Sequence, residues 1–315
     1  MSSSSPARVV VIGSVMVDRV VRVPTIVRAG ETLAAASIET HPGGKGANQA
    51  AAAARAGAAV VFAGRTGRDG AFVLEALEAS GVDVSPSRVD EGASGTALVQ
   101  VASGGENAIA IVPEANARFD REDLDRALRC VRAGDLVLLQ NETALLEESI
   151  ESAHAAGARV WLNAAPAPLR LPSSNLELLD ALVVNETEAE ALAETGAPPD
   201  ALSRLCARLP ESLVVVTLGK FGVLAGRGSS RWSQEAFAVD AIDTVGCGDA
   251  FIGAMAAAIA CGDAVAAALR EAAAAGALAA TRAGAMPSLP TRREIDRLLA
   301  GPSAGTISSS PIGHA

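Results

Sequence analysis

Short runs of β-branched and aliphatic residues alternate with helix-forming segments along most of this 315-residue chain. In the middle of the chain, the runs DLVLLQ and LDALVVN are each followed by a stretch with apolar residues at helical spacing. Continuous apolar runs of this length are typical of strands that are buried on both faces. A chain that alternates such strands with helices builds a parallel sheet covered by helices. The sequence therefore predicts an α/β fold with a mostly parallel sheet.

The N-terminal part departs from this alternation in two places. We expect residues 8–18 (RVVVIGSVMVD) to form one buried strand and residues 45–57 to form a helix that is stopped by a glycine. Between them, residues 20–44 contain short, partly alternating strands, and residues 96–116 have the pattern of a second hairpin around SGGEN. The two hairpins predict a small β flap on the main body.

The chain contains no linker long enough to separate two domains and no internal repeat. We therefore expect a single domain over residues 1–300, with the flap formed by about 18–44 and 95–115. The last segment, 301–315, is rich in Ser, Gly and Pro and is expected to be a disordered tail.

Charge and composition exclude several classes of function. The formal net charge is −10 and the arginines form no run, so a binder of polymeric nucleic acid is not expected. The longest early apolar run, VVVIGSVMV, is too short to span a bilayer, and the N-terminal MSSSSPAR is no signal peptide. The four cysteines lack metal spacing and are too sparse for a disulfide framework. These features favour a soluble cytoplasmic protein that acts on small molecules, with no membrane partner.

The stretch DTVGCGDAF, residues 243–251, places a glycine turn before an apolar helix. The freed backbone N–H groups and the helix dipole make an anion site at such a helix N-terminus. Asp249 would compete with an incoming anion unless it has another task, such as accepting a hydroxyl proton while phosphoryl charge builds in the site. The alternative is that Asp249 caps the helix and the glycines only form the turn.

Two further polar stretches follow or precede strands at the edge where ligands bind in such sheets. HPGGKGANQ, residues 41–49, offers Lys45 and Asn48 as donors for a polyhydroxy ligand, or it is a loop with a solvated lysine. VNETEAE, residues 184–190, places Asn185 and Glu188 where they could organise Mg²⁺ around phosphates, or where they form an N-cap with a capping-box acid. In the second stretch both roles are compatible.

The stretches GGKGANQA, LNAAPAP, VNETEAE, VTLGKFGV, DTVGCGDAF and TRAGAMPS occur in the order and near the spacing found in one enzyme family. Over residues 8 to about 298 the chain resembles the ribokinase-type sugar kinases. The resemblance implies a doubly wound α/β domain with a β-sheet lid over the sugar. It also implies an ATP-dependent pentose kinase that phosphorylates the 5-hydroxyl of D-ribose.

The resemblance carries roles to individual residues. Asp249 would be the general base, and the backbone of Gly246, Cys247 and Gly248 would form the anion hole. The sugar would be bound by Met16, Asp18, Gly44, Lys45, Asn48, Glu142 and Asp249. The nucleotide would be bound by Asn185, Thr217, Gly219, Gly222 and Gly248. Glu188 would steady Mg²⁺. A monovalent cation, K⁺, would be held by Asp243, Val245, Ala279, Arg282, Gly284 and Ser288, several of them through backbone carbonyls. The family often pairs subunits through the lid, so a homodimer is expected.

Two positions depart from the family pattern. Met16 stands where ribokinases usually carry Asn, and a thioether cannot donate a hydrogen bond to a ribose hydroxyl. This suits 2-deoxyribose, as in the deoxyribokinases of the family, unless Met16 only packs under the lid. Glu114 in VPEAN stands where Gly is common and could alter the edge of the lid. A reading of another class, a non-catalytic sugar sensor on the same fold, is disfavoured by the retention of Asp249, Lys45 and Glu188. A nicotinamide dehydrogenase is disfavoured because no G-x-G-x-x-G follows the first strand.

Overall fold

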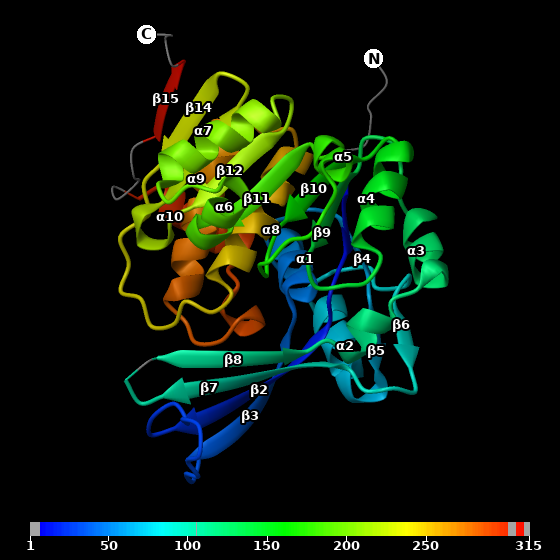
Figure 1. Cartoon of the computed structure of the whole chain (residues 1–315), viewed down its shortest axis with the longest axis vertical. Coiled ribbons are helices and arrows are strands. Elements are labelled where there is room, and N and C mark those ends of the chain that lie inside the picture. The colour runs from blue at the N-terminus through cyan, green and yellow to red at the C-terminus, as the bar shows by residue number, and fades with distance from the viewer. Residues whose placement is uncertain (1–6, 105, 302–306, 312–315) are drawn as a thin grey trace.

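The computed structural model describes residues 7–104, 106–301 and 307–311 (Figure 1). Its centre is a nine-stranded sheet in which neighbours are parallel from the β4 edge as far as β12 and antiparallel from β12 to the other edge. In spatial order the strands are β15 (Ile307–Pro311), β14 (Ser230–Gln234), β13 (Val223–Arg227), β12 (Leu213–Thr217), β11 (Ala181–Asn185), β10 (Arg159–Asn163), β9 (Leu136–Gln140), β1 (Val9–Ile12) and β4 (Val60–Ala63).

Helices cover both faces of this sheet because successive strand residues point to opposite sides. In β1, Val9 and Val11 join one apolar cluster, while Val10 and Ile12 join the other. The first layer consists of α1 (Lys45–Arg55), α2 (Ala71–Ala79), α8 (Cys247–Ala260), α9 (Val265–Ala280) and α10 (Arg292–Leu299). The second consists of α3 (Arg121–Leu128), α4 (Leu146–Ala155), α5 (Ser173–Glu177), α6 (Glu186–Ala193) and α7 (Pro198–Arg208). The predicted doubly wound α/β fold is confirmed.

A separate four-stranded sheet projects from the main body at the lower edge of Figure 1. Its order is β3 (Ser37–Gly43), β2 (Met16–Val23), β7 (Gly95–Ala102) and β8 (Asn107–Val112). These four strands are the two hairpins expected from the sequence, now joined by parallel pairing of β2 with β7. We call them the small sheet. A two-stranded sheet, β5 (Arg65–Gly67) with β6 (Arg88–Asp90), lies apart from it, and four 3₁₀ turns complete the fold: η1 (Arg68–Gly70), η2 (Glu114–Arg118), η3 (Gly219–Phe221) and η4 (Met286–Ser288).

The single strand predicted over residues 8–18 is wrong, because the run divides into β1 and β2, which belong to different sheets. The division falls at Gly13, where a Cβ would lie 2.1 Å from Gln140 Oε1 and 2.7 Å from the Cα of Gly46. Beyond it, Val15 N donates to the side chain of Asn116 at 2.9 Å instead of to a neighbouring strand. A side-chain amide thus replaces the sheet ladder and lets the chain leave the main body.

The C-terminal segment also differs from expectation over residues 307–311, which form the strand β15. This strand pairs with β14 over Ile307–Pro311 and covers the N–H and C=O groups that an edge strand leaves unpaired. Residues 302–306 and 312–315 of the expected tail lie outside the described residues. Within the described part of the chain, no helix has the length and apolar character needed to cross a membrane.

Candidate active site

Asp249 lies in the first turn of α8 and is 9% exposed. Its Oδ2 accepts a hydrogen bond from Asn48 Nδ2 at 3.0 Å, and its Oδ1 accepts one from Gln49 Nε2 at 2.9 Å. Helix α8 has no side-chain cap bond, and the residue before its first turn is Gly246, with φ 79°. Asp249 is therefore not a helix cap. Burial raises the pKa of Asp249, and the positive charge of Lys45 and the two amide bonds lower it only in part.

Lys45 is the first residue of α1 and lies among four carboxyl groups. Burial acts to lower the pKa of Lys45, but the charges of Asp249, Glu142, Glu188 and Asp18 together raise it. These acids come from α8, the turn after β9, α6 and β2, so four distant segments converge on one ammonium group. The structure brings together the predicted base and the predicted sugar-binding charges.

The carboxyl ends of β1 and β9 meet at this point, as the parallel sheet predicts. Ser14, just after β1, donates its hydroxyl hydrogen to Glu142 Oε2, and the backbone N–H of Lys45 donates to the same oxygen at 3.1 Å. Gly46 N donates to Ser14 Oγ at 3.2 Å. Burial raises the pKa of Glu142, opposed by Lys45 and by these bonds. Ser14 was not singled out in the sequence, and it fixes the carboxylate of Glu142 against the start of α1.

Asp18 lies on β2, opposite the glycines that precede α1. A Cβ on Gly43 would lie 2.1 Å from its carboxylate, so only glycine leaves it room. Burial first, and then the charges of Glu142 and Asp249, raise the pKa of Asp18 to about 7. Gly44, next to Gly43, has φ 96° and precedes the first turn of α1.

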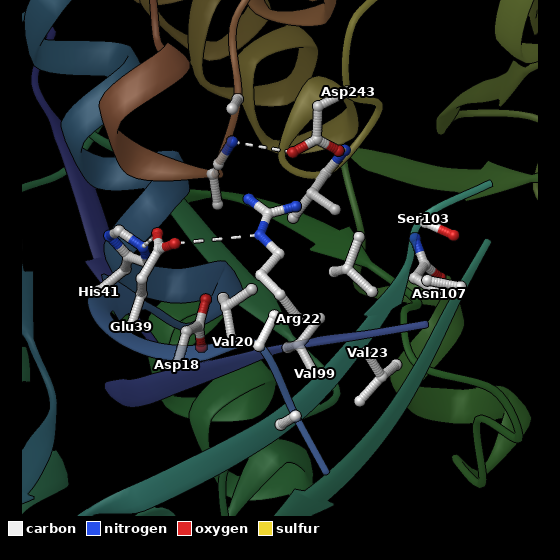
Figure 2. A pocket seen from close by; sticks show the side chains of 18 of the residues that line it. Asp18, Val20, Arg22, Val23, Glu39, His41, Val99, Ser103, Asn107 and Asp243 are labelled. Atoms are coloured by element: carbon white, nitrogen blue, oxygen red, sulfur yellow. Dashed lines mark hydrogen bonds and ion pairs between the residues drawn. The ribbon is translucent and has the colours of Figure 1, made fainter. Parts of the chain in front are cut away.

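Asp18 lines a cavity of about 660 Å³ between the small sheet and the loops after β14 and α9 (Figure 2). The side chains of Arg22, Glu39 and His41 share the small-sheet wall, and Asp243 belongs to the facing loop. Arg22 extends from the small sheet toward that loop, and its Nε lies 3.9 Å from Glu39 Oε1. The projecting sheet closes one side of this cleft, and its charged groups stand among mostly aliphatic lining residues.

A second cavity, of about 650 Å³, lies beside the N-terminus of α8. All residues predicted to bind nucleotide line it: Asn185, Thr217, Gly219, Gly222 and Gly248. A Cβ placed on Gly248 would meet no atom within 4 Å, so packing within the chain does not require glycine there. The open side of Gly248 gives a ligand access to the N–H groups at the start of α8. Cys247 also lines this cavity, and burial raises the pKa of its thiol to about 11, which leaves it protonated and unreactive.

Asn185 and Glu188 form the capping box that the sequence offered as an alternative. Asn185 Oδ1 accepts from Glu188 N at 2.8 Å, and Glu188 Oε2 accepts from Asn185 N at 2.9 Å. Glu188 is buried and its charge acts on Lys45, yet it does not line the second cavity. The capping role is thus observed, and a role at a metal ion would have to use the remaining oxygen, Oε1. No cluster of three or more His, Cys, Asp or Glu suited to a metal occurs among the described residues.

The residues predicted to hold K⁺ fall in two segments that contact each other. Asp243 accepts from Val245 N at 3.0 Å and from Gly284 N at 2.8 Å, so its carboxylate joins the two segments. The remaining members are Ala279, Arg282 and Ser288. Ala279 O accepts from Arg282 N at 3.1 Å, the Arg282 side chain pairs with Glu294, and Ser288 Oγ donates to Ala285 O at 2.7 Å. Only their backbone oxygens, with those of Asp243 and Val245, are suited to a weakly held cation.

Met16 is the first residue of β2, paired with Gly43 and Gly95 in the small sheet, and it is 2% exposed. Its Sδ accepts a long contact of 3.5 Å from Asn116 Nδ2, which also donates to Val15 O. Glu114, the second departure, has φ 42° and pairs with Arg118 at 3.2 Å. The left-handed backbone explains why glycine suits that position, and the ion pair joins the first and last residues of η2.

Gln49 and Gln140 are site residues that the sequence analysis did not select. Gln49 stands within a run of alanines in α1, and Gln140 ends the buried strand β9. A polar residue inside an otherwise apolar buried element was the available signal, since buried polar groups need partners.

Comparison with known proteins identifies the class. The model of the pfkB family of carbohydrate kinases matches residues 6–292. The ribokinase of Bacillus subtilis (strain 168) is 38% identical over 295 residues, which cover 92% of this chain and 98% of that protein. The deoxyribokinase of Salmonella typhi is 36% identical over 259 residues, covering 79% and 84% of the two chains.

The structure of Arabidopsis thaliana ribokinase complexed with ribose and ATP superposes with a TM-score of 0.84 at 32% identity, covering 95% of this chain and 100% of that one. The chain therefore belongs to the pfkB family of carbohydrate kinases, among its ribokinase-type members. As such it is an enzyme, an ATP-dependent pentose kinase.

Proposed function

We propose that this enzyme transfers the γ-phosphoryl group of ATP to the 5-hydroxyl of D-ribose, giving D-ribose 5-phosphate and ADP. The observation that carries the proposal is Asp249, a buried carboxylate that caps nothing. It is held by two amides at the start of α8, and its charge acts on Asp18, which lines the cavity beside the small sheet. A kinase needs a base at this point, between acceptor hydroxyl and anion site.

In the proposed step, the ribose 5-hydroxyl gives its proton to Asp249 as its oxygen forms a bond to the γ-phosphorus. The bond from that phosphorus to the β,γ-bridging oxygen breaks, and ADP leaves. The raised pKa of Asp249 favours proton uptake. In this proposal the N–H groups of Gly246, Cys247 and Gly248 stabilise the charge that builds on the phosphoryl oxygens, because they stand at the N-terminus of α8, where Cys247 and Gly248 line the second cavity.

The sugar is bound in this proposal by Asp18, Glu142, Lys45 and Asn48, with Gly44 leaving space for it. Asn48 Nδ2 already donates to Asp249, and Asn48 Oδ1 is buried without a hydrogen-bond partner among the described residues. It can therefore accept from a sugar hydroxyl, which would also relieve an unpaired buried oxygen. The sequence analysis gave Asn48 the role of donor only.

Two ions complete the proposal. Mg²⁺ bound with the ATP phosphates would neutralise phosphoryl charge, and Glu188 would reach it through Oε1 or through water, as suits an ion that keeps part of its hydration shell. K⁺ would sit between the two contacting segments at Asp243 and Gly284 and strengthen the field at the adjacent anion hole. In this proposal the backbone oxygens of Asp243, Val245, Ala279, Arg282, Gly284 and Ser288 would supply the oxygen donors that such an ion requires.

A second substrate, 2-deoxy-D-ribose, is favoured by Met16. Its thioether offers no donor, and both hydrogens of the neighbouring Asn116 amide are directed to Val15 O and Met16 Sδ. The similarity to a deoxyribokinase supports this alternative. A non-catalytic sugar sensor would keep the fold but has no need for the base.

We further propose a homodimer formed through the small sheet, because that sheet exposes large apolar side chains, including Ile38, Leu98, Ile109 and Ile111. The cytoplasmic location expected from composition stays a prediction.

The first experiment measures initial rates of ATP-dependent phosphorylation of D-ribose and 2-deoxy-D-ribose with Mg²⁺, in K⁺ and in Na⁺. Asp249→Asn should lower kcat by at least about 100-fold, the usual scale for loss of a general base. Asp263→Asn, at an exposed site after α8, is the matched control. Near-normal turnover by Asp249→Asn would remove Asp249 as the base, and no turnover of either sugar by the native enzyme would remove both substrates.

A further inference from the structure

Two glutamine side chains connect β9 to Asp249 through the interior. Gln140 Nε2 donates to Gln49 Oε1 at 2.8 Å, and Gln49 Nε2 donates to Asp249 Oδ1 at 2.9 Å. Gln49 is 0% and Gln140 is 1% exposed. The chain of hydrogen bonds therefore runs from the central sheet, through α1, to α8 with no access to bulk water.

The two bonds on Gln49 fix the direction of its amide. If that amide turned over, its oxygen would face the Asp249 carboxylate and its NH₂ would face the NH₂ of Gln140. Both contacts would be repulsive, and the repulsion would be strong because the local dielectric constant is low in a buried site. The bond from Gln140 thus adds to the preference of Gln49 for presenting a donor to Asp249.

Gln140 is itself placed for this single contact. The Gln140 side chain has space only because residue 13 is glycine, since a Cβ on Gly13 would lie 2.1 Å from Gln140 Oε1. That oxygen is buried without a hydrogen-bond partner among the described residues. An amide that served the packing of β9 alone would be expected to satisfy both of its ends. Gln140 satisfies only the end that faces Gln49.

The donor matters because of the charges around Asp249. Burial opposes its ionisation, and so do Asp18 from β2 and Glu142 after β9, while Lys45 on α1 favours it. A further titratable neighbour is Cys247 on the same helix, where burial raises the pKa of the thiol to about 11. The two amides, Gln49 and Asn48, supply the other favourable contacts with the charged form.

We propose that Gln49, oriented by Gln140, is a positioning residue that keeps Asp249 ionised and its carboxylate fixed for proton transfer. The proposal rests on the proposed role of Asp249 as the base. Asn48 lies within reach of the sugar in that proposal, whereas Gln49 and Gln140 act only through Asp249.

The test follows the ionisation of Asp249 directly, by ¹³C NMR of the aspartate carboxyl carbons as a function of pH, in the full-length protein without substrate. Asp249→Asn identifies the resonance. In Gln49→Leu, which keeps the side-chain size but has no donor, the Asp249 titration should move to higher pH by about one unit, the scale of one lost hydrogen bond to a carboxylate. Gln140→Leu, which frees the Gln49 amide to turn, should give a smaller shift in the same direction.

Activity gives the second readout. The acidic limb of the pH profile of kcat should move to higher pH together with the NMR titration. At pH values below that limb, kcat of Gln49→Leu should be about tenfold lower than kcat of the native enzyme, while KM for the sugar should change less than about threefold. Asn175→Leu removes a buried amide from α5 and is the matched control for loss of stability. Should Gln49→Leu fold poorly, Gln140→Leu and Gln49→Met carry the same comparison.

An unchanged Asp249 titration in both folded glutamine variants would overturn the proposal. A different result would be a shifted Asp249 titration in the glutamine variants together with near-normal turnover of sugar by Asp249→Asn. That result would support the hydrogen-bonded chain from Gln140 to Asp249 and refute the catalytic role of Asp249 instead. The two failures are therefore distinguishable.

Discussion

Gly246 lies so close to Ala285 that a Cβ on Gly246 would stand 2.7 Å from the Cα of Ala285. Gly246 also has φ 79°, a conformation that residues with side chains rarely adopt. We expect Gly246→Ala to lower the free energy of unfolding by about 2 kcal/mol or more, because strain and overpacking add. Denaturant unfolding measures this change. A variant as stable as the native protein would show that the two loops move apart at little cost.

Gly248→Ala is the contrasting change two residues further on. Its added methyl group meets nothing within 4 Å and sits in a helical turn, so stability should stay within about 0.5 kcal/mol or improve. Because the methyl group would project into the cavity proposed for ATP, we expect kcat/KM for ATP to fall at least tenfold. Unchanged kinetics would place the transferred phosphoryl group elsewhere.

The pKa of Asp18, raised to about 7, predicts a pH dependence of sugar binding. Asp18 accepts hydrogen bonds from the sugar most effectively when ionised, so kcat/KM should fall about tenfold per unit as pH drops below 7. Asp18→Asn should lower kcat/KM and abolish the fall below pH 7 that Asp18 causes. Any acidic fall in kcat/KM that belongs to Asp249 should remain. Persistence of the whole limb in Asp18→Asn would assign it to another group.

The same group affects stability with a definite sign. Asp18 in the folded protein retains its proton up to about pH 7, whereas the ordinary pKa of an aspartate is 3.8. Its contribution to stability is therefore fully present below pH 3.8 and is lost as pH rises through 7. The gain in unfolding free energy from Asp18→Asn should be about 2–3 kcal/mol larger at pH 8 than at pH 5. An equal gain at both pH values would show that the carboxyl group is not held in this state.

Met16 is the residue proposed to decide between D-ribose and 2-deoxy-D-ribose. Met16→Asn should raise the ratio of kcat/KM for D-ribose over 2-deoxy-D-ribose about 5- to 10-fold if the side chain faces the 2-hydroxyl, the worth of one buried hydrogen bond. It should also cost about 1–2 kcal/mol of stability, because a buried thioether is replaced by a smaller polar group. Met16→Leu keeps the volume and should leave the ratio unchanged. An unchanged ratio in Met16→Asn would make Met16 a packing residue only.

The sequence predicts the layers and the site edge well, because periodicity and glycine-rich strand ends are local signals. It does not predict that residues 8–18 divide between two sheets, since the break depends on Gly13 meeting Gln140 and Gly46, which are distant in sequence. Nor does it reveal that Asp249 is bound by Asn48 and Gln49, although the motif that contains both amides is evident. Residue types and their local spacing indicate a base and donors, while only the fold decides which donor holds which oxygen.

The register of the small sheet separates its exposed apolar residues into two faces, and this makes the proposed dimer testable. Ile38 pairs with Val21, and Leu98 pairs with Arg19, so Ile38 and Leu98 share one face. Ile109 pairs with Val99, which lines the first cavity, so Ile109 lies on the opposite face. Two packed copies of the sheet would cover one of these faces and leave the other in water.

We therefore expect one of the variants Leu98→Glu and Ile109→Glu to dissociate the dimer at micromolar concentration, because burying a lone carboxylate in an apolar contact is strongly unfavourable. Sedimentation equilibrium measures the mass. Val89→Glu, at a similarly exposed apolar residue on β6 outside the small sheet, is the control and should leave the mass unchanged. The variant that dissociates identifies the face that is covered.

If the covered face is that of Ile109, dissociation should also raise KM for the sugar, since the cavity wall loses its support. A native protein that sediments as a monomer, or a dimer that survives both substitutions, would refute pairing through the small sheet.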